Sequence, residues 1–308
     1  MIKVLSVNTS KKTGTIKLPV PGIKLTENGV EGDAHAGPWN RQVSLLGTES
    51  IRKFEKDAGR TIAPGEFAEN ITTSGMELWK CKPLDRFMND EVVLEVTQIG
   101  KECHGTSCSI FREVGNCVMP KEGIFCRVLM PGTLKPGASL TYFPKKYTIQ
   151  VITLSDRASA GHYEDKSGPR LMELINSFFD SYQAPRTTHH KLIPDSPDKL
   201  SSLLKKAQAD QPDFLFTTGG TGIGPKDITP DIVKPFLDKE IPGIMDAIRM
   251  KYGMEKPQAL LSRSIAGVMG KTLVFCLPGS VRAVNEYFAE ISRSLFHMIY
   301  MIHNLDSH

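Results

Sequence analysis

The 308-residue sequence has no long apolar run and no dense cluster of lysine and arginine. No stretch approaches the roughly 20 consecutive apolar residues of a membrane-spanning helix, and the apolar N-terminal segment is too short for a signal peptide. The net charge of +4 is too small to favour a nucleic-acid partner. These absences predict a soluble, cytoplasmic protein that binds neither a membrane nor nucleic acid.

Cysteine is sparse and unevenly distributed. Six cysteines in 308 residues do not make the disulfide framework of a small secreted domain, and five of the six lie in the first half of the chain. The length favours two domains, and glycines and prolines between residues 132 and 144 mark a boundary. We expect one domain over residues 1–144 and another, with different chemistry, over residues 147–308.

The most informative stretch lies in the second half, at residues 214–231. Its first five residues are apolar or β-branched and predict a short buried strand, and Thr229-Pro230-Asp231 is typical of a helix start. The loop between them is rich in glycine and threonine, and a strand, a glycine loop and a helix start together present backbone N–H groups to an anion. The loop matches neither the Walker A pattern nor the dinucleotide-binding pattern. A tight turn without a ligand is the alternative.

Strands and helices alternate through the rest of the second half. This alternation predicts an α/β domain with a mainly parallel sheet sandwiched by helices, and ligands of such sheets bind beyond the carboxyl ends of the strands. Polar and glycine-rich clusters follow four of the expected strands, which makes a shared site more convincing than any one motif. The clusters are Ser155-Asp156-Arg157, Asp195-Ser196, the glycine loop with Asp227, and Pro278-Gly279-Ser280.

These clusters and their spacing resemble the MogA/MoaB family, in which the MogA-type members are molybdopterin adenylyltransferases. The resemblance spans about 160 residues and includes Thr217–Gly222, Lys226–Asp231, Leu261–Arg263 and Leu277–Ser280. It implies a molybdopterin-binding fold and the reaction of ATP with molybdopterin to give adenylyl-molybdopterin and pyrophosphate. It also implies a homo-oligomer, a trimer or a hexamer, and molybdenum-inserting enzymes and molybdoenzymes as partners.

The resemblance and the chemistry of the reaction together suggest roles for the residues of the second half. A phosphate nucleophile is already ionised at neutral pH, so the carboxylates are better employed on Mg²⁺ between the phosphates. Asp195 and Asp227 are therefore the expected catalytic, magnesium-holding pair. The expected binding residues for ATP and molybdopterin are Ser155, Asp156, Arg157, Thr218, Gly219, Gly220, Thr221, Gly222, Ser262, Arg263, Pro278, Gly279 and Ser280.

The first half consists of short β-type runs between frequent glycines and prolines. This pattern predicts a β-rich, barrel-like domain with one helix at Thr48–Ala58. Three clusters of polar residues stand out, at residues 29–37, 64–75 and 100–111. In the third, Cys103 follows an expected strand and lies beside Lys101 and His104, whose charges favour a reactive thiolate.

The residues Val30–His35, Gly65–Ile71 and Cys103 resemble those of MOSC domains, which are related to the C-terminal part of molybdenum-cofactor sulfurase. The resemblance implies that Cys103 carries sulfur or ligates molybdenum in a pterin-bound cofactor. It also implies that Asp33, His35, Glu66 and Asn70 line the same pocket.

Simpler interpretations remain open for these residues. Cys103 could be a buried reduced thiol, and His35 could only tie down a turn. Cys108, Cys117 and Cys126 fit no standard zinc spacing and are either core thiols or an additional metal or cluster site. For the whole protein, the alternatives to an adenylyltransferase are a non-catalytic carrier of the cofactor and a MOSC-type reductase or sulfur-transfer enzyme.

Overall fold

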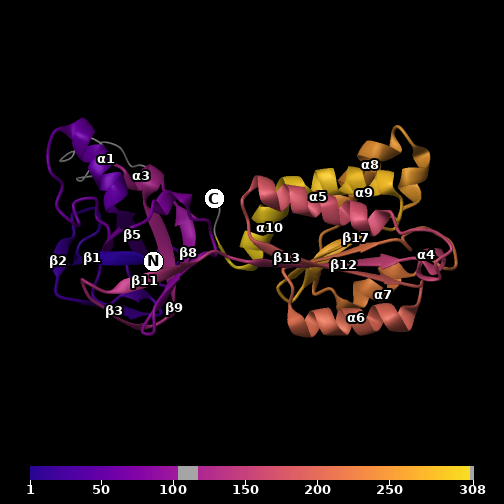
Figure 1. Ribbon diagram of the computed structural model, residues 1–308, viewed down its shortest axis with the longest axis horizontal. Coiled ribbons are helices and arrows are strands. Elements are labelled where there is room, and N and C mark those ends of the chain that lie inside the picture. Colours follow the sequence, from indigo (N-terminus) through magenta and orange to yellow (C-terminus); the bar gives the residue numbers. More distant parts are fainter. Residues whose placement is uncertain (103–116, 306–308) are drawn as a thin grey trace. The chain divides into compact units, whose positions relative to one another are not determined.

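The structure is a computed structural model that describes residues 1–102 and 117–305. The chain divides into two compact units (Figure 1). Unit 1 comprises Met1–Lys145 together with Leu305, and unit 2 comprises Lys146–Asn304. No helix within the described ranges is both long and apolar enough to cross a membrane.

Unit 1 is built on a closed barrel of seven strands, which confirms the expected β-rich, barrel-like domain. The barrel closes because its first and last strands in sequence, β1 and β11, pair with each other. The seven strands, in their order around the barrel, are β11 (Ser139–Phe143), β7 (Arg86–Met88), β8 (Val93–Ile99), β9 (Ile124–Met130), β5 (Val43–Gly47), β6 (Ile71–Ser74) and β1 (Ile2–Thr9).

Several smaller elements surround this barrel. Strand β2 (Leu18–Val20) extends the barrel sheet beyond β1, and a three-stranded sheet has the order β10 (Gly132–Leu134), β3 (Ile23–Thr26), β4 (Gly29–Val30). The helical elements are α1 (Thr48–Ala58), the 3₁₀ turn Leu78–Lys80 and α3 (Met119–Glu122). The alternation of side chains along barrel strands sends Val4, Leu94 and Ile124 into one fully buried core.

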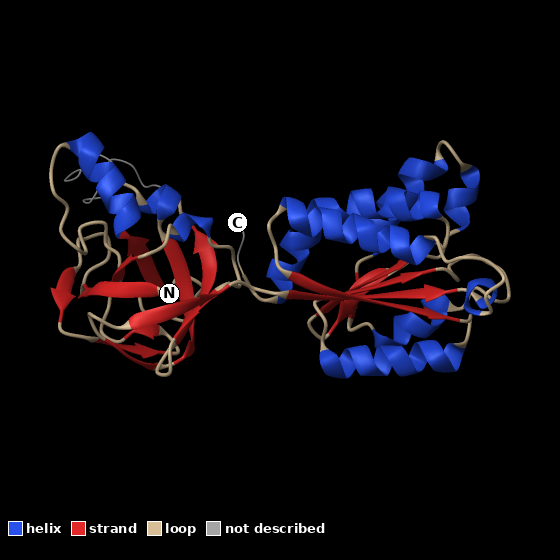
Figure 2. Cartoon of the chain, viewed as in Figure 1, coloured by secondary structure: helices blue, strands red, loops and turns tan. Residues whose placement is uncertain are grey.

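Unit 2 is built on a six-stranded sheet (Figure 2). Four neighbouring strands are parallel: β13 (Arg186–Ile193), β12 (Tyr147–Leu154), β14 (Phe214–Thr218) and β17 (Thr272–Leu277). The last two strands of the sheet, β16 (Ala266–Met269) and β15 (Lys239–Glu240), are antiparallel to their neighbours. The parallel strands bring their carboxyl ends to one edge of the sheet.

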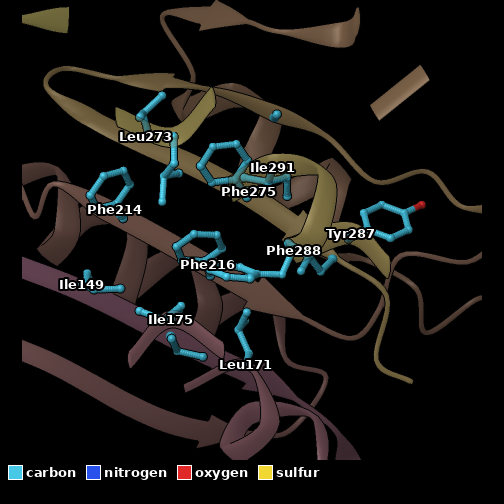
Figure 3. Close-up of a cluster of buried hydrophobic side chains, with 14 of the residues drawn as sticks. Ile149, Leu171, Ile175, Phe214, Phe216, Leu273, Phe275, Tyr287, Phe288 and Ile291 are labelled. Carbon is cyan, nitrogen blue, oxygen red and sulfur yellow. The ribbon is translucent and has the colours of Figure 1, made fainter. Parts of the chain in front are cut away.

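Helices pack on both faces of this sheet (Figure 2). On one face, α5 (Ser167–Ser181), α8 (Pro242–Gly253), α9 (Val281–Ile291) and α10 (Leu295–Ile302) share a core with the strands. On the other face, α6 (Pro197–Asp210) and α7 (Thr229–Val233) form a smaller core. Figure 3 shows Phe214, Phe216 and Phe275 of the central strands packed among helix residues. The remaining helical elements are α4 (Asp156–Ser159) and 3₁₀ turns at Lys234–Phe236, Pro257–Leu261 and Ser292–Ser294.

The apolar period of residues 281–302 predicts one long amphipathic helix, but the structure divides this segment in two. It is interrupted by the 3₁₀ turn Ser292–Ser294 between α9 and α10. The Ser292 hydroxyl donates to the backbone carbonyl of Ala289 at 3.2 Å, and such side-chain bonds compete with regular helix geometry. The apolar period continues across the turn, so the sequence pattern alone did not reveal it.

Candidate functional site

A cavity of about 750 Å³ opens at the carboxyl ends of the parallel strands of unit 2. Each of the strands β12, β13, β14 and β17 is followed within two residues by residues of the cavity wall. Eleven of the thirteen residues expected to bind ligands in this half line it, together with Asp195 and Asp227. The eleven are Ser155, Asp156, Arg157, Gly219, Gly220, Thr221, Gly222, Ser262, Pro278, Gly279 and Ser280.

The glycine loop needs its glycines for steric reasons. Gly219 has φ +104°, and a Cβ there would lie 2.3 Å from the backbone oxygen of Leu154. Gly220 has φ +63°, and a Cβ there would lie 2.5 Å from the hydroxyl of Thr229, which itself donates to the Gly219 carbonyl at 2.8 Å. The loop therefore folds tightly between β14 and α7, with its backbone at the cavity wall.

Two carboxylates of the cavity are joined to each other through the backbone. The N–H of Asp156 donates to Asp195 at 2.9 Å, and the N–H of Asp195 donates to Asp156 at 3.0 Å. The ammonium of Lys226 contacts the free oxygen of Asp156 at 2.6 Å, and this hydrogen bond lowers the pKa of the Asp156 carboxyl. A residue of the glycine loop is thereby connected to the ends of β12 and β13.

Asp195 has an unusual electrostatic environment. Burial raises its pKa above the ordinary value, and the charges of Asp156 and Asp227 raise it further, against the opposing effects of the Asp156 N–H and of Lys226. Asp227 accepts a hydrogen bond from the N–H of Gly224 at 2.8 Å. The cavity wall carries four carboxylates (Asp156, Asp165, Asp195 and Asp227) and three cations (Arg157, Lys166 and Lys226). The crowding of Asp156 and Asp227 around Asp195 is a local excess of negative charge that a divalent cation would relieve.

Arg263 and Thr218 do not line the cavity but support its wall. Arg263 donates to the Gly222 carbonyl at 2.8 Å and to the Asp227 carbonyl, and it pairs with both oxygens of Asp231 at 2.8 and 2.9 Å. The buried hydroxyl of Thr218 donates to the Pro278 carbonyl at 3.2 Å. Arg263 thus holds the glycine loop in place, and Thr218 joins the end of β14 to the segment after β17. A structural role is the simpler interpretation for both side chains.

The cavity also contains residues for which the sequence reasoning gave no role. Tyr163, Asp165, Lys166, Ser167 and Gln258 line it. The guanidinium of Arg157 lies 5.2 Å from the centre of the Tyr163 ring, and the hydroxyls of Tyr163 and Ser155 are 3.0 Å apart. Tyr163, Asp165, Lys166 and Ser167 follow the end of β12 by nine to thirteen residues. Residues 165–169 also belong to the segments that resemble the MogA/MoaB family, which was the signal that could have identified Asp165, Lys166 and Ser167.

Unit 1 has a smaller pocket, of about 130 Å³. Of the residues expected there, His35 and Asn70 line it. Asn70 is almost fully buried, and its carbonyl oxygen accepts hydrogen bonds from the N–H and hydroxyl of Ser44, so it supports the wall. The lining consists of His35, Trp39, Arg41, Ser44, Phe67, Ala68, Asn70, Lys101, Met119 and Phe125.

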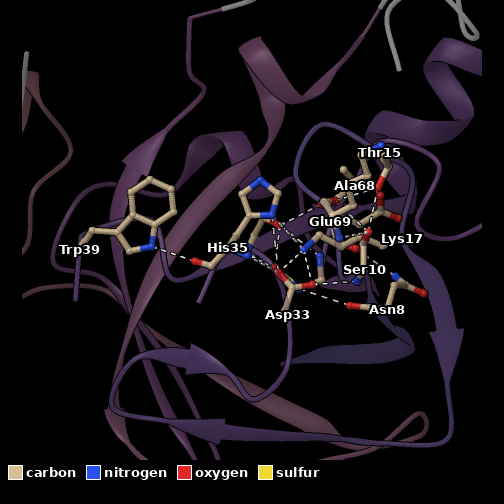
Figure 4. Close-up of polar contacts among 12 residues, drawn as sticks. Asn8, Ser10, Thr15, Lys17, Asp33, His35, Trp39, Ala68 and Glu69 are labelled. Carbon is tan, nitrogen blue, oxygen red and sulfur yellow. Dashed lines mark hydrogen bonds and ion pairs between the residues drawn. The ribbon is translucent and has the colours of Figure 1, made fainter. Parts of the chain in front are cut away.

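Asp33 and Glu66 are not among these lining residues. Asp33 is buried beside His35 and pairs with the equally buried Lys17, whose Nζ lies 2.6 Å from both carboxylate oxygens (Figure 4). Burial alone would raise the pKa of Asp33, but hydrogen bonds from His35 and Lys17 outweigh it and hold the pKa well below its ordinary value. Glu66 pairs with Arg60 at 2.8 Å and accepts from the Ala63 N–H.

Three cysteines of unit 1 lie within the described residues, and one of them, Cys117, is partly buried against the smaller apolar core that includes Ile51 and Phe54. Cys103 and Cys108 lie outside the described residues. Cys81 and Cys126 are buried in the barrel core, and burial raises the pKa of the Cys81 thiol to about 12 and that of Cys126 well above its ordinary value. Within residues 1–102 and 117–305, no group of three or more potential ligand side chains is placed to hold a metal ion.

Each of the two units is similar to a known protein family. A family described as a probable molybdopterin binding domain matches residues 150–297, and the MOSC domain family matches residues 32–141. Unit 2 is 37% identical over 139 residues to a molybdopterin adenylyltransferase of Helicobacter pylori, which covers 45% of this chain and 77% of that protein. The chain therefore belongs to the MogA/MoaB family of molybdopterin-binding proteins, with a MOSC domain at its N-terminal end.

Other relatives align with only part of this chain, and in some cases only part of the relative is covered. Gephyrin of Dictyostelium discoideum is 32% identical over 166 residues, which is 52% of this chain but only 23% of gephyrin. A solved structure of the tungsten cofactor synthesizing protein MoaB from Pyrococcus furiosus is 35% identical, with a TM-score of 0.45, and the match covers 52% of this chain and 98% of that one.

Proposed function

We propose that unit 2 transfers the adenylyl group of ATP to molybdopterin. The observation that best supports this proposal is that Asp195, Asp227 and the glycine loop share the wall of one cavity at the carboxyl ends of the parallel strands. The name of the Helicobacter pylori relative, molybdopterin adenylyltransferase, agrees with it. The protein would thus act in molybdenum cofactor biosynthesis.

The reaction joins two anions. A phosphate oxygen of molybdopterin forms a bond to the α-phosphorus of ATP, the bond from that phosphorus to the bridging oxygen breaks, and pyrophosphate leaves with the bonding electrons. Because the nucleophile is already ionised, alignment and charge compensation matter more than a general base. We assign alignment to the backbone N–H groups of Gly219–Gly222 and to the N-terminus of α9, where Gly279 and Ser280 line the cavity.

Mg²⁺ fits the carboxylates of this cavity. It is commonly bound in proteins by one or two carboxylates together with substrate phosphates, and Asp195 and Asp227 would supply that pair. When bound, Mg²⁺ compensates the negative charge of the phosphate groups. The raised pKa of Asp195 supports this assignment, because it reflects burial and carboxylate crowding that a cation would relieve. Lys226, paired with Asp156, would add a positive charge close to the same phosphates.

Substitution of the two aspartates tests the proposal. Purified Asp227→Asn and Asp195→Asn proteins should fold normally but transfer the adenylyl group roughly 100-fold more slowly or worse, as expected when charge compensation is lost. The measurement is pyrophosphate release from ATP in the presence of molybdopterin and Mg²⁺. Asp198→Asn is the matched control, because Asp198 is exposed on α6, outside the cavity. Wild-type protein that binds molybdopterin without consuming ATP would instead identify a non-catalytic carrier.

We further propose that unit 1 binds the molybdenum cofactor or an intermediate, with Cys103 carrying sulfur or ligating molybdenum. The match to the MOSC family and the pocket at His35 support this assignment. Covalent linkage of two domains raises the effective concentration of an intermediate that passes between them. Metal analysis of the protein purified from cells, wild type against Cys103→Ser, tests it: equal molybdenum content would remove Cys103 as a ligand.

We also propose that the chain forms a trimer or hexamer through unit 2. Two strongly exposed apolar side chains lie at the end of helix α8: Met250, in its last turn, at 62%, and Met254, directly after it, at 85%. Exposed apolar side chains favour an interface. Light scattering after size-exclusion chromatography should give three or six times the mass of 34.0 kDa. A monomeric mass across micromolar concentrations would contradict this.

A further inference from the structure

The pocket of unit 1 has a strongly one-sided charge. Three of its lining side chains, His35, Arg41 and Lys101, are basic, and no carboxylate of the described residues lines it. Asp33, the carboxylate adjoining His35, is already engaged by Lys17 and is 1% exposed. The lining side chains of the described residues therefore carry a net positive charge from Arg41 and Lys101.

The arginine of this pocket is held in place before any ligand arrives. The guanidinium of Arg41 lies 5.3 Å from the centre of the Trp39 ring, which is a cation–π contact. The indole N–H of Trp39 donates to the His35 carbonyl at 2.8 Å (Figure 4). Asp33 in turn accepts from the backbone N–H of His35 at 2.9 Å. A chain of contacts thus runs from the buried Lys17–Asp33 pair to the guanidinium, which reduces the entropy lost on binding.

The size of the pocket narrows the kind of ligand. Its volume of about 130 Å³ is about four times the roughly 30 Å³ that one water molecule occupies in the liquid. That space suits a tetrahedral anion with four oxygens and is too small for a whole pterin with its side chain. Arginine binds such oxyanions through two parallel N–H groups, and lysine binds them as a point charge.

We propose that this pocket is a tetrahedral oxyanion site in which Arg41 and Lys101 bind the anion and Trp39 positions Arg41. The anion is either the phosphate group at the end of a larger phosphorylated ligand or a free oxyanion of the phosphate and molybdate type. The first source rests on the function proposed for unit 1, whereas the second does not. Both sources place the same dianion between the same two cations.

A fluorescence titration tests the proposal at this pocket alone. The chain has two tryptophans, so in a full-length Trp79→Phe background Trp39 is the only one and reports on its own surroundings. Phosphate, molybdate and phenyl phosphate are titrated in separate experiments. We expect a saturable change in Trp39 fluorescence, and at least tenfold weaker binding after Arg41→Gln and Lys101→Gln are introduced together.

The control removes the same charge elsewhere in unit 1. Arg60→Gln combined with Lys24→Gln replaces one arginine and one lysine that pair with Glu66 and Glu31 on the surface, and it should change affinity less than twofold. Arg41→Lys alone should keep part of the binding, which distinguishes lost contacts from misfolding. No saturable response to any of the three anions, or equal affinity in the double variant, overturns the proposal.

The relative affinities of the three anions also show whether the natural ligand is a larger phosphorylated molecule or a free oxyanion. Phenyl phosphate that binds at least tenfold more tightly than both inorganic anions indicates the end of a larger ligand, and the reverse order indicates a free oxyanion. Neither result depends on unit 2, because adenylyl transfer by the Arg41→Gln/Lys101→Gln protein should equal that of the wild type. Failure of the oxyanion site would therefore leave the proposed adenylyl transfer intact, and failure of adenylyl transfer would leave the oxyanion site intact.

Discussion

Asp156 and Asp195 exchange hydrogen bonds, each backbone N–H donating to the carboxylate of the other at 2.9 and 3.0 Å. This reciprocal pair joins the ends of β12 and β13, which are neighbours in the sheet but about forty residues apart in sequence. It keeps two negative charges close together at the wall of the cavity. Burial and the charges of Asp156 and Asp227 raise the pKa of Asp195, so its ionised form is destabilised in the folded protein.

We therefore expect Asp195→Asn to stabilise the protein at neutral pH while it reduces activity. A carboxyl whose folded-state pKa is raised favours folding most when protonated, so this contribution is present below the unfolded pKa of about 4 and is lost as pH rises through the folded value. Asparagine stays neutral and still accepts the Asp156 N–H. Urea unfolding at pH 7 should show a higher midpoint for the variant.

The stability difference should shrink toward zero as the pH falls toward 4. Adding Mg²⁺ at pH 7 should stabilise the wild type more than Asp195→Asn, because the cation compensates a charge that the variant lacks. A variant less stable than the wild type at pH 7 would show that the Asp195 carboxylate is not under electrostatic strain.

Gly219→Ala should damage both folding and activity. The residue has φ +104°, and the added Cβ would lie 2.3 Å from the Leu154 carbonyl oxygen. Such strain costs about 1–3 kcal/mol, measurable by urea unfolding. Gly243→Ala is the matched control, because a Cβ at Gly243, in the first turn of α8, meets nothing within 4 Å. Equal stability of the two variants would contradict the assigned close contact.

Arg263→Lys should weaken ATP binding with little loss of stability. Arg263 is a positioning residue that reaches the Gly222 carbonyl and Asp231 together, and a lysine cannot reproduce its planar fork. A loosened glycine loop should raise KM for ATP by roughly tenfold, equivalent to about 1.4 kcal/mol, with a smaller change in kcat. Steady-state kinetics measures this. A fall in kcat at unchanged KM would argue against a loop-positioning role.

Thiol labelling should separate the cysteines by burial. Cys81, Cys126 and Cys276 are buried, and burial raises the pKa of the Cys81 and Cys276 thiols to about 12. Since the thiolate is the reactive form, iodoacetamide at pH 7 should leave these three unmodified in the native protein. Cys103 should react quickly and should be protected by bound cofactor. Peptide mapping by mass spectrometry gives the result, and slow labelling of Cys103 would favour the buried-thiol interpretation.

Local patterns were sufficient for much of unit 2. The strand, glycine loop and helix start at residues 214–231 appear in the structure as β14, the loop and α7, because strand burial, positive φ and helix initiation depend on neighbouring residues. The antiparallel strands β15 and β16 were missed. They are only two and four residues long, so they carry no recognisable period.

Local sequence patterns did not predict which side chains face the pocket of unit 1. Glu66 and Asp33 lie in the same sequence clusters as their neighbours, yet neither lines the pocket of unit 1. Arg41 and Lys101, whose residue type alone is equally typical of a solvated surface charge, do line it. Residue type and spacing do not reveal which partner a charge meets once distant strands pair.

The sequence by itself determined the two units, their classes of fold and the strand ends at which ligands bind, because these follow from periodicity, turn residues and motif spacing along the chain. Only the tertiary structure decided which of those residues face a common cavity and which support its wall. It also decided that Lys17 forms an ion pair with Asp33 and that Asp156 and Asp195 exchange hydrogen bonds. The physical reason is that charge pairing and burial are set by contacts between residues far apart in sequence, and these contacts exist only after the sheet and barrel have closed.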